Sequence, residues 1–184
     1  ALNLENPLLP KNLIGFATRQ SVILEFAPTF ISVIMAGKVG SYITSSLGTM
    51  RVTEQIDALE VMGINTYNYL IFPKIISLSL YPLIICVSMF LGIFGGWVAG
   101  LSSSMFSEID YMQGLQLDFN PFLVQYALIK TLIFAFLIAT VPSYHGYYVK
   151  GGSIAAGRAI TQAVVWTTIL IVVANYILTQ LLLT

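Results

Sequence analysis

Charged side chains are scarce in this sequence. Of its 184 residues, 8 are Lys or Arg and 8 are Asp or Glu, so 9% are charged and the formal net charge is zero. Soluble domains usually carry about a quarter charged residues, whereas 57% of this chain is hydrophobic. This composition is that of a membrane protein, and the few scattered basic residues argue against nucleic-acid binding.

Cysteine and histidine are almost absent. The single Cys86 excludes a disulfide within the chain, and its apolar neighbours indicate a packing role. With His145 as the only histidine, the side chains for a metal site are lacking. The segment AGKVGS has a Gly-Lys pair without the full P-loop pattern, and the His-Glu-x-x-His motif is missing. We therefore predict that the chain is not an enzyme and has no cofactor of its own.

Long apolar runs predict the fold. A helix needs roughly 20 apolar residues to cross a bilayer. Such runs predict four spanning helices, at about 13–48, 70–100, 121–143 and 159–182. A short helix at about 50–63 and a polar, acidic loop at about 101–120 connect them. The expected fold class is an all-α integral membrane protein.

The basic residues predict the orientation. Arg51, Lys74, Lys150 and Arg158 flank the first and third connections, and the second connection has no basic residue. Because basic loops stay in the cytoplasm, we expect the first and third connections to be cytoplasmic, and the acidic loop and both ends of the chain to face outward. Lys130 is the only charge in the third span, and we expect its long side chain to reach the membrane interface.

Residues 50–65, MRVTEQIDALEVMGIN, place a charge at every third position. The charged residues are Arg51, Glu54, Asp57 and Glu60. With apolar residues between them, they predict an amphipathic helix. An interfacial helix with a solvated face is one interpretation, but such helices favour Lys and Arg. We favour a helix that docks into a basic groove of a cytoplasmic protein.

Small residues recur in the first span at four-residue spacing: Ala36, Gly40 and Thr44. Stripes of this kind let helix backbones approach closely in lipid. The spacing alone leaves two alternatives open, packing within one bundle and packing between two subunits.

The segment AGKVGSYITSSLGTMRVTEQIDALEVMGIN resembles the signature of the MlaE-type permease family, the membrane subunits of ABC transporters that move phospholipids between membranes. LEFAP, residues 24–28, is similar to the family's Arg-Glu-Leu-Gly-Pro motif, and GYYVKGGSIAAGRAITQAVV is similar to a later family stretch. Leu24, Ala27 and Lys38 depart from the family's Arg, Gly and Arg. A role of the missing Arg therefore does not carry over.

The resemblance implies that residues 1–184 form a single permease domain of a multi-pass protein in the bacterial inner membrane. It implies a homodimer with a second permease copy, a cytoplasmic ATPase subunit that binds ATP, and an MCE-domain protein on the outer side. Arg51, Glu54, Asp57 and Glu60 would lie on the coupling helix that meets the ATPase. The family fold has a further N-terminal interfacial helix and spanning helix, so this chain would begin in the outer loop that follows them.

Glu25 is the acid placed within a span. Ionisable residues in spans usually face a cavity or the bundle interior. Glu25 could pair with Arg19, or be protonated and bonded to a neighbouring helix. We favour a place at the rim of an outward-opening lipid cavity between two subunits, lined by Leu24, Pro28, Phe30 and Ile31. We also expect the stripe of Ala36, Gly40 and Thr44 to lie along the dimer axis.

The function predicted from the sequence is a permease subunit that moves phospholipid or a related lipid between inner and outer membranes, coupled to a separate ATPase. Two alternatives remain. An ABC importer permease for a small solute would need several inward polar residues, and the spans offer few. A non-transporting membrane scaffold would need neither the acid in the span nor the docking helix.

Overall fold

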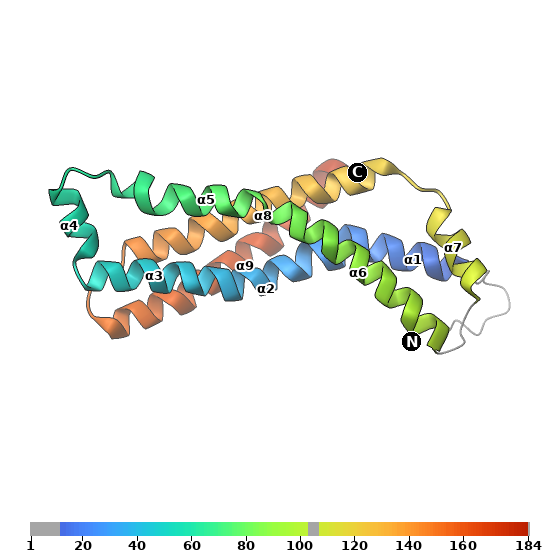
Figure 1. Cartoon of the computed structure of the whole chain (residues 1–184), viewed down its shortest axis with the longest axis horizontal. Coiled ribbons are helices and arrows are strands. Elements are labelled where there is room, and N and C mark those ends of the chain that lie inside the picture. The colour runs from blue at the N-terminus through green and yellow to red at the C-terminus, as the bar shows by residue number, and fades with distance from the viewer. Residues whose placement is uncertain (1–11, 103–106, 184) are drawn as a thin grey trace.

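The computed structural model describes residues 12–102 and 107–183, and every regular element among them is helical. The molecule is elongated, with long helices running side by side along its length (Figure 1). The segments Leu13–Val52, Tyr67–Ser102, Pro121–Tyr147 and Ser153–Leu182 are each long and apolar enough to cross a membrane. The predicted all-α fold with four spanning helices is confirmed, and each segment reaches beyond its predicted range.

The first span is one continuous helix with two wider turns. It consists of α1 (Leu13–Ser21), η1 (Val22–Phe30), α2 (Ile31–Met35), η2 (Ala36–Gly40) and α3 (Ser41–Val52), in which η1 and η2 are π-helical. Pro28 lies inside η1 and has no backbone N–H, so it cannot continue the ordinary α-helical pattern. Wider π-helical turns are frequent at functional sites, and η1 is also the element that carries Glu25.

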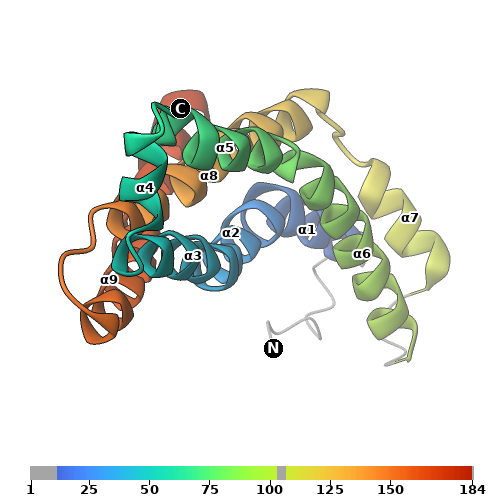
Figure 2. The same ribbon diagram turned by 60° about the vertical axis from the view of Figure 1, so that its left-hand side comes forward.

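The second span changes direction at its middle. It begins with the π-helical η3 (Tyr67–Ile71), continues as α5 (Phe72–Ser79) and, after Leu80, as α6 (Tyr81–Ser102). Pro82 at the start of α6 cannot donate a backbone hydrogen bond to the preceding turn. As a result α6 diverges from the line of α5, as Figures 1 and 2 both show.

Two short helices lie at opposite ends of the bundle (Figure 1). α7 (Glu108–Gln116) begins with a capping box between Ser107 and Asp110. It packs closely on the start of α1, since a Cβ added to Gly15 would collide with the Tyr111 carbonyl and one added to Gly114 with the carbonyl of Asn12, the residue before α1. The predicted loop at about 101–120 therefore contains a helix, and its residues 103–106 lie outside the described residues.

The helix predicted at about 50–63 is divided, which corrects its extent. α3 ends at Val52, and Glu54 then adopts a left-handed conformation with φ of 58°. The short helix α4 (Gln55–Val61) follows. The turn at Glu54 brings Ile56 into the bundle, where it is fully buried in a cluster with Leu47 and other apolar residues.

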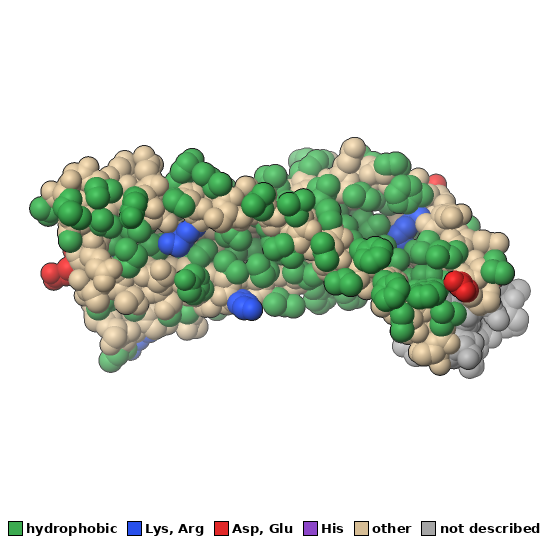
Figure 3. Space-filling view, in the orientation of Figure 1, with side chains coloured by type: hydrophobic (Ala, Val, Ile, Leu, Met, Phe, Trp, Pro, Cys, Tyr) green, Lys and Arg blue, Asp and Glu red, His purple; other side chains and the backbone are tan. Residues whose placement is uncertain are grey.

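α8 (Pro121–Tyr147) and α9 (Ser153–Leu183) complete the bundle. α8 is the most buried of the four spanning segments and packs against α3, α5 and α9. It starts at Pro121, where the Asn120 side chain accepts a hydrogen bond from the Phe122 N–H at 3.0 Å. Hydrophobic side chains cover much of the visible face, and acidic ones are seen only toward its two ends (Figure 3). This surface suits a helix bundle surrounded by lipid.

Candidate functional site

A cluster of polar side chains joins three helices inside the spanning region. The Glu25 Oε1 atom accepts a hydrogen bond from the Lys130 ammonium at 3.0 Å, and the two side chains form an ion pair. Glu25 Oε2 accepts hydrogen bonds from the Thr29 hydroxyl at 2.9 Å and from the Asn175 amide at 3.1 Å. η1, α8 and α9 therefore meet at one carboxylate.

The two partners of the ion pair differ in exposure. The Lys130 side chain is fully buried, whereas 40% of the Glu25 side chain is accessible. A buried ammonium is stable only when it is paired and hydrogen-bonded, and Glu25 supplies the opposite charge. The accessible part of Glu25 leaves room for a further polar group at the surface of the bundle.

Lys130 also supports the backbone of η1. Its ammonium donates a hydrogen bond to the Leu24 carbonyl at 3.0 Å. In an α-helix this carbonyl would accept from the residue four positions later, which is Pro28 and has no N–H to give. Lys130 thus adds a side-chain donor to the Leu24 carbonyl, and it connects the carboxylate and the proline turn of η1.

The structure corrects one expectation about these charges and excludes one alternative. Lys130 does not reach the membrane interface, because its ammonium is held by Glu25 and by the Leu24 carbonyl. Arg19 does not pair with Glu25. Its guanidinium instead donates to the carbonyls of Leu115 at 2.6 Å and Asp118 at 3.3 Å, at the end of α7.

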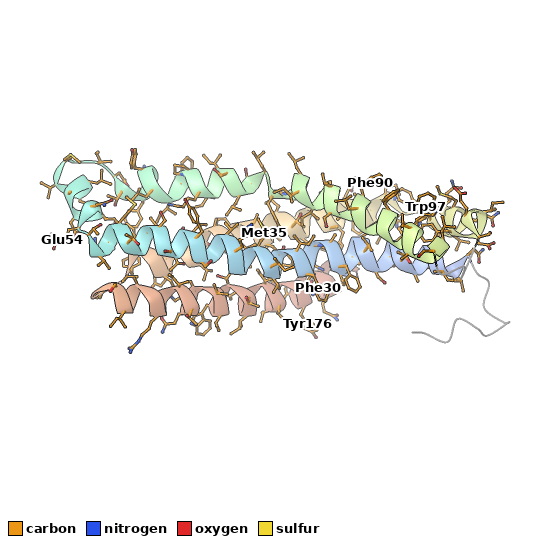
Figure 4. The ribbon with its side chains drawn as sticks, turned by 60° about the horizontal axis from the view of Figure 1, so that its bottom comes forward. Phe30, Met35, Glu54, Phe90, Trp97 and Tyr176 are labelled. Carbon is orange, nitrogen blue, oxygen red and sulfur yellow. The ribbon has the colours of Figure 1, made fainter. Side chains whose placement is uncertain are left out.

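The apolar residues predicted around Glu25 do not all share one surface. Pro28 is buried, and Ile31 packs against the buried cluster that includes Ile23 and Tyr81. Phe30 is 57% exposed and stacks on Phe26. Figure 4 shows Phe30 and Tyr176 of α9 at a similar level of the bundle, and Leu24 is partly exposed. Glu25, Leu24 and Phe30 thus have accessible surface, while Pro28 belongs to the interior.

The stripe of Ala36, Gly40 and Thr44 is covered by the chain's own α8. Ala36 and Thr44 are buried, and the Thr44 hydroxyl donates to the Pro142 carbonyl at 3.0 Å. A Cβ added to Gly40 would lie 3.1 Å from Cγ of Pro142. Packing within one bundle accounts for the stripe. Because these three residues already pack against other helices of the same chain, a dimer axis would have to run along another surface.

The four charged residues near α4 fall into three environments. Arg51 and Asp57 form an ion pair at 2.6 Å. Glu60 turns toward the bundle, where its carboxylate accepts from the hydroxyls of Tyr147 at 2.8 Å and Thr66 at 3.3 Å. Glu54 is exposed and lies at the extreme end of the molecule (Figure 4). The structure therefore leaves Glu54 as the acid most available to a partner.

A layer of tyrosines supports this end of the molecule. Tyr147 stacks on Tyr67 with ring centroids 4.7 Å apart, and the Arg51 guanidinium lies 5.8 Å from the centre of the Tyr147 ring. The hydroxyls of Tyr67 and Tyr148 are 2.9 Å apart, and this hydrogen bond is the main reason that the pKa of Tyr148 is raised. The start of η3 and the end of α3 are thereby tied to the end of α8.

Sequence reasoning missed Lys130, Asn175, Thr66 and Tyr147 as partners of the predicted acids. A charge in an otherwise apolar span was the available signal for Lys130, because such a residue needs a partner. The other three are ordinary polar or aromatic residues of helical segments, and their roles follow only from the packing. Among the described residues, no group of three or more His, Cys, Asp or Glu is placed to hold a metal ion.

Comparison with known proteins gives consistent matches. The family described as Permease MlaE matches residues 2–181. A probable ABC transporter permease protein of Rickettsia bellii is 36% identical over 162 residues, which cover 88% of this chain and 62% of that protein. A probable ABC transporter permease protein of Synechocystis is 33% identical over 170 residues, which cover 92% of this chain and 65% of that protein.

A plant protein is also similar. The Arabidopsis thaliana protein Trigalactosyldiacylglycerol 1, chloroplastic, is 30% identical over 164 residues, which cover 85% of this chain and 45% of that protein. The chain spans less than two thirds of the length of each of these three relatives.

Proposed function

Since this chain belongs to the MlaE permease family and is a multi-pass membrane protein, we propose that it is the permease subunit of an ABC transporter that moves phospholipid or a related lipid. The observation that carries the lipid assignment is the Glu25 side chain, 40% accessible and paired with Lys130, in the π-helical η1 whose other residues are mainly apolar. A carboxylate there can bind water or the amine of a headgroup, while the apolar surface around it suits acyl chains. The name of the Arabidopsis relative is that of a glycerolipid, which agrees with this proposal.

The polar residues of the spans favour a lipid over a small polar solute. Thr131, Ser143 and Thr167 are buried, and each hydroxyl donates to a carbonyl of its own helix. They are therefore used by the fold and offer no row of free polar groups along a solute path. A lipid needs such groups only where its headgroup lies.

The coupling role is proposed for the end of the bundle that contains α4. In the orientation predicted by the basic residues, this end is cytoplasmic and meets the ATPase subunit, which would bind the ATP. Exposed Glu54 and the partly exposed Arg51–Asp57 pair give the partner a charged surface. Next to them lies an open hollow of about 350 Å³, lined by Glu60, Gly63, Ile64, Asn65, Thr66 and Tyr67.

The remaining parts of the assembly follow from the family. We propose a bacterial inner-membrane homodimer with an MCE-domain protein on the outer side, as the sequence predicts. The spans containing α6 and α9 are the least buried within one chain. Their exposed apolar surfaces, on which Phe90 and Tyr176 are prominent (Figure 4), are available to lipid or to the second copy.

The test combines transport with charge reversal. The protein is reconstituted in vesicles with its ATPase subunit, and the ATP-dependent transfer of labelled phospholipid is measured against that of a labelled small solute. Replacing Glu54 and Asp57 together with Lys should reduce recovery of the ATPase and lipid-dependent ATP hydrolysis through like-charge repulsion. Each exposed pair contributes only about 0.2–1 kcal/mol, so the double change is needed.

The matched control is Glu108→Lys, which reverses an exposed acid of α7 at the opposite end of the bundle. It should bind the ATPase normally. If the double reversal also binds the ATPase subunit normally and supports normal lipid-dependent ATP hydrolysis, the docking role of α4 is refuted. ATP-dependent transfer of the solute without transfer of lipid would refute the lipid assignment.

A further inference from the structure

A basic cavity lies where α8 ends and α9 begins. It has a volume of about 360 Å³, and its lining includes Lys150, Arg158 and Gln162 together with Tyr144 and Tyr148. This volume is within the range of roughly 300–1,000 Å³ typical of small-molecule sites. Of the described residues that line the cavity, none is Asp or Glu.

The two cations of this cavity have no counter-charge. The side chains of Lys150 and Arg158 make no hydrogen bond or ion pair with another described residue. The acids of α4 are engaged elsewhere, because Asp57 pairs with Arg51 and Glu60 accepts from Tyr147. The cavity thus offers two free positive charges to a ligand, with the amide of Gln162 as a further hydrogen-bonding group.

Helical spacing explains why these groups converge. Ala155, Arg158, Ala159 and Gln162 recur at three- and four-residue steps and so share one face of α9. Two of these four are alanines, whose short side chains leave space between α9 and the end of α8. The positive side chains therefore border an open volume and not a packed interface.

We propose that this cavity binds the phosphoryl group of an anionic membrane lipid. Arg and Lys are the side chains that bind phosphate oxygens, Arg through a planar fork and Lys as a point charge. Basic pockets between spanning helices on the cytoplasmic side are places where anionic headgroups bind. This assignment does not depend on ATP coupling or on Glu25, and it goes beyond the proposed transport function.

The surroundings of the cavity point to a lipid as the source of the phosphoryl group. Tyr144 and Tyr148 are 62% and 50% exposed, and aromatic residues at the ends of spans lie at headgroup level. Ile154, in the first turn of α9, is 77% exposed. An exposed apolar side chain next in sequence to Ala155, which lines the cavity, is compatible with acyl chains, whereas free phosphate would gain nothing from it.

The experiment measures which lipids stay bound. The protein is purified from vesicles that contain phosphatidylcholine and phosphatidylglycerol, and the bound lipid is identified by native mass spectrometry. The parent should be enriched in phosphatidylglycerol. Arg158→Gln and Lys150→Gln should each lower the enrichment about fivefold, which corresponds to the roughly 1 kcal/mol contributed by one basic side chain near an anionic surface.

Two controls distinguish lipid binding in this cavity from a general attraction of anionic lipid to positive charge. Lys38→Gln removes an exposed positive charge that does not line the cavity, and it should leave the enrichment unchanged. Ala155→Leu fills the cavity while keeping every charge, and it should lower the enrichment. Equal effects of Lys38→Gln and Arg158→Gln, or full enrichment in Ala155→Leu, would overturn the proposal.

A third arm tests the source of the phosphoryl group. Inorganic phosphate is added to the parent before the lipid is measured, and the enrichment should persist. If inorganic phosphate abolishes the enrichment of the parent at concentrations that do not change the lipid bound by Arg158→Gln, the cavity is a free-phosphate site. That result would overturn the lipid assignment. Because this experiment measures bound lipid, the proposed lipid site can be refuted while the proposed transport function holds. The transport function can likewise be refuted while the lipid site holds.

Discussion

Replacing Glu25 with Gln removes the counter-charge of Lys130 while almost preserving the shape of the side chain. Lys130 would then be a fully buried ammonium without an opposite charge, left with neutral partners that include the Leu24 carbonyl and the Tyr126 ring, whose centre is 5.3 Å away. Removing one partner of a buried ion pair costs about 3–5 kcal/mol. Because Glu25 is itself 40% accessible, we expect the free energy of unfolding to fall by an amount at the lower end of this range, about 3 kcal/mol.

The second variant of this experiment removes both charges. Replacing a buried pair with uncharged residues is often close to neutral, so Glu25→Gln combined with Lys130→Met should recover most of the stability. What stays lost is the hydrogen bond from Lys130 to the Leu24 carbonyl, about 0.5–1.5 kcal/mol. The double variant should therefore be more stable than Glu25→Gln alone.

Thermal unfolding in detergent, followed by tryptophan fluorescence, measures both effects. At about 2–4 °C per kcal/mol for a chain of this size, Glu25→Gln should lower the midpoint by roughly 6–12 °C. Glu54→Gln is the matched control, because Glu54 is exposed and should change stability by less than about 0.5 kcal/mol. A parent-like midpoint for Glu25→Gln, or a double variant less stable than Glu25→Gln alone, would refute the buried-pair reasoning.

Two further predictions concern close packing and the tyrosine layer. Gly146→Ala should lower the free energy of unfolding by about 1–3 kcal/mol, because its Cβ would lie 2.8 Å from the Thr44 carbonyl oxygen. The control is Gly157→Ala, whose new Cβ would have nothing within 4 Å. It should leave the stability unchanged or raise it in the same unfolding assay. Tyr67→Phe should lower the pKa of Tyr148 toward its ordinary value, because the hydrogen bond between the two hydroxyls is the main cause of its rise. Tyrosine-selective ¹³C NMR would show this, and an unchanged pKa would count against that cause.

The spanning helices could be predicted because they depend on local composition. An apolar run that is long enough has few alternatives to a helix in lipid, since every backbone polar group must be satisfied within the segment. The predicted ranges about 13–48 and 121–143 lie inside the observed Leu13–Val52 and Pro121–Tyr147. The observed ends extend further because polar and aromatic residues continue the helices beyond the apolar core.

The turn before α4 could not be predicted with the same ease. A left-handed backbone is uncommon for a residue with a side chain, and Glu54 carries no signal for it in the sequence. The periodic charges of residues 50–65 therefore indicated one uninterrupted helix. The burial of Ile56 against the ends of α3 and α8 decides where the chain turns.

The sequence by itself determined that this chain crosses a membrane, how many spans it has, where its acidic connection lies and which family it resembles. Only the tertiary structure decided which side chains meet. Glu25 and Lys130 are 105 positions apart, and the small-residue stripe packs against Pro142 of α8 in the same chain. Helical periodicity specifies the face on which a residue lies, whereas its partner depends on how the helices rotate and cross, which is settled by packing the whole bundle at once.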